Sequence, residues 1–101
     1  MTIQSAWRVI VSSRSGGGKA SNDWPSISKL LEDKGIPFVA SVTDHSYHAI
    51  ELASGAVAEG YRKLLVVGGD GAVHEVLNGL YSQKEVSPSE VTLALIPVGS
   101  G

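Results

Sequence analysis

The chain alternates short apolar runs with longer segments in which apolar side chains recur every three or four positions. Consecutive apolar residues are typical of strands that are buried on both faces of a sheet. The runs predict four strands, at residues 7–11, 36–42, 64–67 and 92–96.

Each segment between two runs has the spacing of an amphipathic helix. In the first, Ser21, Asn22 or Asp23 is expected to cap the helix, with Pro25 in its first turn and Gly35 at its end. A second helix is expected from about 46 to 60 and a third from 71 to 80. The residues expected to face inward are Trp24, Ile27, Leu30 and Leu31, then Ala49, Ile50, Ala53, Ala56 and Val57, then Val73, Val76, Leu77 and Leu80.

Strands that alternate with helices predict an α/β fold. The β-α-β-α-β-α-β order favours a Rossmann-like three-layer α/β/α arrangement with a parallel sheet. The 101 residues are expected to form one domain, truncated at its C-terminal end, because the sequence stops inside a glycine-rich turn at 97–101.

Composition narrows the class of protein without naming a function. A net charge of −2, with scattered Lys and Arg, gives no case for a nucleic-acid binder. The absence of cysteine excludes disulfides and thiolate metal sites, and fits a reducing compartment such as the cytoplasm. No apolar run is long enough to be a transmembrane segment, and the N-terminus lacks the features of a secretion signal.

Polar or glycine-rich turns follow the predicted strands at 12–19, 68–71 and 99–101, and Thr43 follows the remaining strand. In open α/β sheets, ligands bind beyond the carboxyl ends of the strands, so these turns are expected to converge on one site. Glycine lets a ligand approach the backbone closely, and the N-terminus of the next helix attracts anions.

Two carboxylates complicate a simple anion site at the third turn. Asp70 and Glu75 would repel phosphate unless Mg²⁺ lay between them, or unless Asp70 served as a base or orienter for an attacking hydroxyl. The combination therefore indicates phosphoryl transfer.

Other motifs do not fit. A Walker A loop fails because Ala20 follows Gly18-Lys19, and the dinucleotide fingerprint fails at His74. His45 and His48 are three residues apart, but no third ligand is apparent in the sequence, so no metal site of the His/Cys type is expected.

Three motifs in order resemble the catalytic domain of the diacylglycerol kinase family, which includes bacterial lipid kinases and the sphingosine and ceramide kinases. They are SSRSGGGK at 12–19, GGDGAVHEVLNGL at 68–80 and PVGSG at 97–101. The resemblance covers essentially the whole chain. It implies an ATP-dependent kinase with Mg²⁺ that phosphorylates a lipid hydroxyl, with the nucleotide lying between this domain and a following β-rich domain.

The resemblance also implies roles for individual residues. Asp70 becomes the catalytic candidate, as a base or as an organiser of Mg²⁺. The nucleotide contacts implied are Ser12, Ser13, Arg14, Ser15, Gly16, Thr43, Gly69, Asp70, Gly71, Ala72, Val73, His74, Glu75 and Ser100. The lipid acceptor would bind through the missing domain, with peripheral membrane contact there, and the isolated fragment is expected to be close to inactive and to form a homodimer through uncovered apolar surface.

Two departures from the family pattern keep alternatives open. Ser12-Ser13 replace Asn-Pro, and Ala72 replaces a threonine. The alternatives are an NAD-kinase-like or sugar-phosphate kinase domain, and a nucleotide-sensing domain that has lost catalysis.

Overall fold

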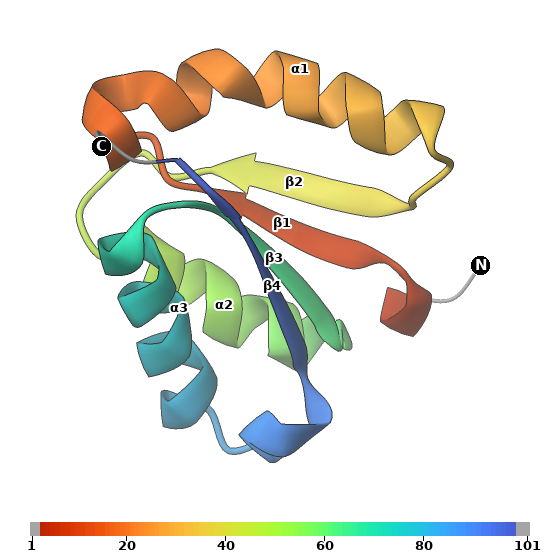
Figure 1. Ribbon diagram of the computed structural model, residues 1–101. Coiled ribbons are helices and arrows are strands. Elements are labelled where there is room, and N and C mark those ends of the chain that lie inside the picture. Colours follow the sequence, from red (N-terminus) through yellow and green to blue (C-terminus); the bar gives the residue numbers. More distant parts are fainter. Residues whose placement is uncertain (1–2, 99–101) are drawn as a thin grey trace.

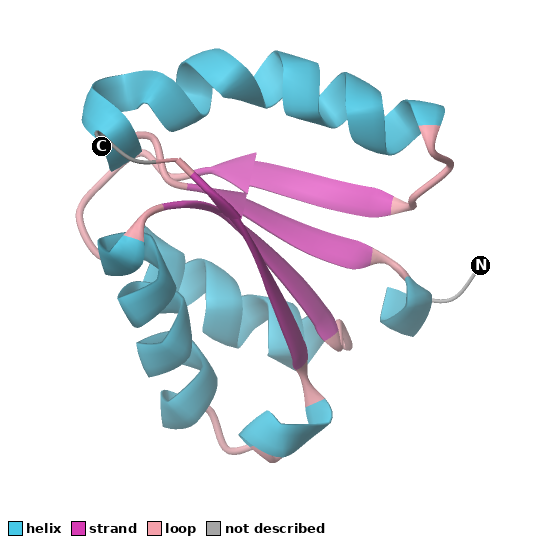
Figure 2. Cartoon of the chain, viewed as in Figure 1, coloured by secondary structure: helices cyan, strands magenta, loops and turns pink. Residues whose placement is uncertain are grey.

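The computed structural model describes residues 3–98, which form four strands and three α-helices joined by loops and short 3-10 turns. The elements are β1 (Trp7–Val11), α1 (Lys19–Asp33), β2 (Phe38–Val42), α2 (His48–Glu59), β3 (Lys63–Gly68), α3 (Asp70–Ser82) and β4 (Thr92–Pro97). Their order and type confirm the predicted β-α-β-α-β-α-β fold (Figure 2).

The strands form one parallel sheet in the order β2-β1-β3-β4. Helix α1 covers one face of the sheet, and α2 and α3 cover the other, so the predicted three layers are present (Figure 1). The chain moves outward from β1 to β2 on one side and from β3 to β4 on the other. The sheet order therefore reverses between β1 and β3, which is where α/β folds place their ligands.

Side chains that alternate along the central strands build two apolar layers. In β1, Val9 and Val11 pack on the α1 side, whereas Ile10 packs against α2 and α3, and all three are fully buried. Full burial of a Val or Ile side chain stabilises the fold by about 1.5–3 kcal/mol. On the α1 side, Trp24 meets the edge of Phe38 with ring centroids 5.8 Å apart, which holds α1 against β2.

The predicted start of the first helix is wrong. Helix α1 begins at Lys19, ahead of the expected caps at 21–23, and Pro25 lies inside it. The exposed ring of Pro25 removes one N–H donor, and the carbonyl four residues earlier can bond water instead. Leu30 is also not in the core: it is 55% exposed, because it falls at the edge of the stripe that Ile27 and Leu31 define.

The second helix agrees closely with its prediction. It begins at His48, two residues later than expected, because Tyr47 has a left-handed backbone with φ 66°. Gly60, also left-handed, follows its last residue. Its inward face is confirmed for Ala49, Ala53, Ala56 and Val57, all buried.

Candidate functional site

The loops after the strands meet at the carboxyl edge of the sheet, next to the N-terminal ends of α1 and α3 (Figure 1). Backbone hydrogen bonds continue the sheet into these loops. Ser12 N–H donates to Val67 O, Thr43 N–H to Val11 O and Val98 N–H to Gly68 O, each at 2.9 Å. The strand register therefore fixes the positions of the loops relative to one another.

A cleft of about 430 Å³ lies between the loop after β1 and the start of α3. We call it the main cleft. Its lining consists of Ser12, Arg14, Ser15, Gly16, Gly69, Asp70, Gly71, Ala72, Glu75 and Val98. Segments separated by more than fifty residues in the chain thus form one concave surface.

The wall formed by the loop after β1 depends on glycine. Gly16, Gly17 and Gly18 have φ of 63°, 67° and 96°, a region that other residues rarely adopt. Just before these glycines, the Ser15 N–H donates to Ser12 O at 3.3 Å, and the Ser15 hydroxyl accepts the N–H of Gly69 at 3.2 Å. The Ser15 contact holds the two glycine-rich turns together.

Helix α3 points its first turn at the main cleft. Gly69 is its N-cap residue, and the N–H groups at the start of a helix have no partner within it. These groups, with the positive end of the helix dipole and the Arg14 guanidinium on the opposite wall, suit an anion.

Two carboxylates share the main cleft with these donors. Asp70, exposed, is the first residue of α3, and Glu75, partly buried, lies five residues later in the same helix. Oxygen ligands of this kind suit Mg²⁺, and an added Cβ at Gly71 would meet nothing within 4 Å, so there is room beside Asp70. The residues present therefore fit a polyphosphate accompanied by Mg²⁺.

A second hollow of about 230 Å³, the side cavity, adjoins the main cleft and shares Ser12, Arg14 and Glu75 with it. Thr43 lies in its wall and is buried. The Thr43 hydroxyl accepts the N–H of Ser13 at 2.9 Å and lies 3.2 Å from the Ser13 hydroxyl. Ser13 therefore holds Thr43 in place, although it lines neither hollow.

Most of the predicted site residues are brought together. Thr43 lines the side cavity, and the main cleft collects nine others, namely Ser12, Arg14, Ser15, Gly16, Gly69, Asp70, Gly71, Ala72 and Glu75. Val73 packs against the core on the α2 side, and His74 is exposed and lines neither hollow. Ser100 lies outside the described residues. Contact of these residues with a nucleotide stays a prediction.

Four residues that line the hollows were not among the predicted site residues, namely His45, Ser46, Tyr47 and Val98. Their signal is position, since each follows the end of a strand at the carboxyl edge. Ser46 also accepts a hydrogen bond from Arg14 Nη1 at 3.3 Å, which joins the loops after β1 and β2.

Comparison with known families shows which family the chain is similar to. Residues 6–101 match the model of the diacylglycerol kinase catalytic domain. The chain belongs to this family. Membership confirms the resemblance seen in the three motifs and favours the diacylglycerol kinase family over the NAD-kinase and sugar-phosphate kinase alternatives.

Individual family members agree with this assignment. The chain is 35% identical to sphingosine kinase 1 of Rattus norvegicus over 92% of its length, and 30% identical to sphingosine kinase B of Dictyostelium discoideum over 93%. A crystal structure of a diacylglycerol kinase from Bacillus anthracis str. Sterne superposes on 98% of the chain with a TM-score of 0.69 and 25% identity. The family is therefore shared in both sequence and fold.

The chain spans only part of these relatives. It covers 25% of the rat kinase, 12% of the Dictyostelium kinase and 35% of the Bacillus anthracis chain. Between residues 3 and 98, no helix has the length and apolar character that crossing a membrane requires.

Proposed function

We propose that this chain binds the ATP of a lipid kinase, which transfers the γ-phosphoryl group to a lipid hydroxyl. The observation that carries the proposal is the main cleft, where a glycine loop, a helix N-terminus and a carboxylate meet at the point of strand-order reversal. Phosphoryl transfer depends mostly on positioning and charge stabilisation, which these elements supply.

Each group of residues in the main cleft has its own role in this proposal. The first N–H groups of α3 and the Arg14 guanidinium hold phosphate oxygens, and the glycines keep the approach open. Asp70 and Glu75 would hold Mg²⁺, which would supply neutralising charge at the phosphates. Asp70 either accepts the proton of the lipid hydroxyl or orients the groups around it. The side cavity, with Thr43 in its wall, takes the nucleoside end.

The acceptor half of the reaction lies elsewhere in this proposal. A following β-rich domain would supply the lipid site and the peripheral membrane contact, in a protein that works in the cytoplasm. The 101 residues alone would be close to inactive, because half a cleft positions only the donor. The homodimer expected from the sequence also stays a prediction.

Titration with Mg-ADP, followed by backbone amide NMR, tests the donor site directly. We expect shift changes concentrated at residues 12–16 and 68–75, with further changes at Thr43. Amides in the C-terminal half of α1, on the far side of the molecule, serve as the internal control. An absence of change in the two glycine-rich turns would contradict the nucleotide site.

Kinase activity tests the catalytic part, in a protein that includes the lipid-binding region. Asp70→Asn keeps the size of the side chain and removes its charge. We expect loss of lipid phosphorylation with nucleotide binding retained, and unchanged turnover would remove Asp70 from its role. The second candidate is a nucleotide sensor, motivated by Ser12-Ser13 and Ala72, which depart from the family pattern. Nucleotide binding with no phosphorylation of any lipid hydroxyl tested would favour this candidate.

A further inference from the structure

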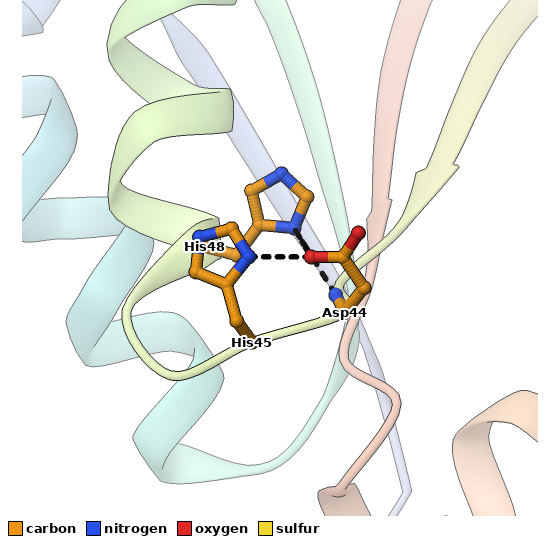
Figure 3. A group of neighbouring side chains, drawn as sticks. All are labelled: Asp44, His45 and His48. Atoms are coloured by element: carbon orange, nitrogen blue, oxygen red, sulfur yellow. Dashed lines mark hydrogen bonds and ion pairs between the residues drawn. The ribbon is translucent and has the colours of Figure 1, made fainter.

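The loop between β2 and α2, together with the first residue of α2, holds two of the three histidines of the chain beside an aspartate (Figure 3). The Asp44 carboxylate contacts His45 Nδ1 and lies 3.3 Å from His48 Nδ1. One ligand atom from each of the three residues lies within 4.8 Å of the others. This cluster is separate from the carboxylates of the main cleft, although His45 lines the side cavity.

The spacing of the cluster is close to that of a metal site. Zn²⁺ binds imidazole nitrogen and carboxylate oxygen at about 2.0–2.2 Å in a tetrahedron, which places neighbouring ligand atoms roughly 3.3 Å apart. The distance from Asp44 Oδ1 to His48 Nδ1 already has this value. The Asp44 and His45 side chains are 77% and 51% exposed, so each can turn toward an ion without disturbing the core.

The His48 ring is the fixed member of the cluster, since its side chain is only 19% exposed. Its Nδ1 accepts the backbone N–H of Asp44 at 3.1 Å, so an ion bound at this nitrogen would take the place of that hydrogen bond. The His45 ring stacks on it, with centroids 4.2 Å apart and planes 18° from parallel. The stacked rings thus hold their nitrogens close to one another and to the Asp44 carboxylate.

The remaining surroundings suit a ligating histidine. Glu51 Oε2 lies 3.6 Å from His45 Nε2, the nitrogen that faces away from Asp44. A carboxylate at the outer nitrogen orients a metal-bound imidazole and raises its basicity. The left-handed turn at Tyr47 brings His48 back towards Asp44, so the three ligands arise within five residues of chain.

We propose that Asp44, His45 and His48 form a binding site for a zinc-like divalent cation, with a fourth position open to water. Two imidazoles and one carboxylate favour Zn²⁺ or Co²⁺ over Mg²⁺, which prefers oxygen ligands. The site is distinct in its chemistry from the proposed Mg²⁺ position beside Asp70. The proposal departs from the expectation from the sequence, because it takes Asp44, directly next to His45, as the third ligand.

Occupation of this site ties the end of β2 to the start of α2. Thr43, the residue before Asp44, is bonded to both β1 and Ser13. The ion would bind the folded chain and have no preformed site in the unfolded one, so it stabilises the fold by mass action.

Titration of the metal-free chain with Zn²⁺, without nucleotide, tests the proposal independently of kinase function. We expect saturable binding of one ion by calorimetry, a rise in melting temperature, and Co²⁺ absorption bands typical of four-coordinate nitrogen and oxygen ligation. Asp44→Asn and His45→Gln should each weaken Zn²⁺ binding at least about tenfold, as the loss of a ligand or its support does. His74→Gln, which removes the exposed third histidine on α3, is the matched control and should bind normally.

Two results would overturn the proposal. One is the absence of saturable Zn²⁺ binding by a chain whose circular dichroism shows it folded. The other is an equal affinity in the Asp44→Asn, His45→Gln and His74→Gln variants. Because Asp44 and His45 are exposed, their variants remain informative even if replacement of the partly buried His48 impairs folding.

Discussion

The two glycines at the end of β3 differ in what an added methyl group would meet. A Cβ on Gly68 would lie 2.8 Å from Ser15 Oγ, 2.9 Å from Ala72 Cβ and 3.1 Å from Ser12 Cβ. A Cβ on Gly69 would meet nothing closer than Val98 O at 3.6 Å, an ordinary contact, and its φ of −113° suits alanine. Replacing each by alanine therefore separates a packing role from a role in binding.

The expected effect on stability follows from these distances. Crowding at Gly68 should cost about 1–3 kcal/mol, offset by about 0.4–1 kcal/mol from the stiffer unfolded chain, so the net loss is roughly 1–2 kcal/mol. For a domain of this size, each 1 kcal/mol lowers the melting temperature by about 4–8 °C. Gly69→Ala should be neutral or stabilising by up to about 1 kcal/mol, because no crowding opposes the gain from the stiffer unfolded chain.

For nucleotide binding, the variant expected to show the loss is Gly69→Ala. The Gly69 methyl group would stand in the main cleft, where the proposed phosphate approaches the backbone. We expect Mg-ADP affinity to fall at least about tenfold in Gly69→Ala, equivalent to about 1.4 kcal/mol. Thermal unfolding by circular dichroism and calorimetric titration measure the two quantities on the same samples.

The reasoning fails if Gly69→Ala loses as much stability as Gly68→Ala and binds Mg-ADP like the wild type. That outcome would mean that the glycines serve only a tight strand-to-helix turn. A Gly68→Ala variant as stable as the wild type would show that Ser15 moves aside freely, and that its bond to Gly69 does not hold the loop.

Two further predictions concern the helices and the histidine cluster. Gly79→Ala should lower the free energy of unfolding by about 1–2 kcal/mol, because its Cβ would crowd Ile50 O and this crowding outweighs the better helix propensity of alanine. Gly55→Ala, with open space around the added Cβ, should instead raise the free energy of unfolding by about 0.5–1 kcal/mol. Urea unfolding measures both changes. In the metal-free chain, the hydrogen bond between the two side chains raises the pKa of His45 above 6.5 and lowers the pKa of Asp44 below 3.8. The pairing of His45 with Asp44 is therefore fully present between pH 3.8 and 6.5. It is lost as pH rises through the folded pKa of His45, and also as pH falls through the folded pKa of Asp44. NMR titration of the His45 ring should show this raised pKa, and Asp44→Asn should lower it; an unchanged pKa in that variant would contradict the pairing.

The sheet could be predicted from the sequence because burial on both faces leaves a strong signal. Residues 7–11 are apolar at nearly every position, and the strand they predict matches β1 at both ends. The start of α1 gave no comparable signal. Ser21, Asn22 and Asp23 are good capping residues, and Pro25 favours a first turn, yet the chain becomes helical at Lys19 as soon as the left-handed run at 16–18 ends.

The same difference separates the main cleft from the histidine cluster. The cleft could be predicted because the parallel register carries Ser12, Thr43 and Val98 to one edge through the bonds of the sheet itself. The cluster depends instead on one backbone angle, the φ of 66° at Tyr47. No glycine stands at this position, and the apolar periodicity does not predict a left-handed residue there. A search for ligands spaced along a helix finds His45 and His48 but misses Asp44, because the carboxylate reaches them across a loop. Sites fixed by sheet register are therefore within reach of sequence reasoning, whereas sites fixed by a single loop dihedral need the structure.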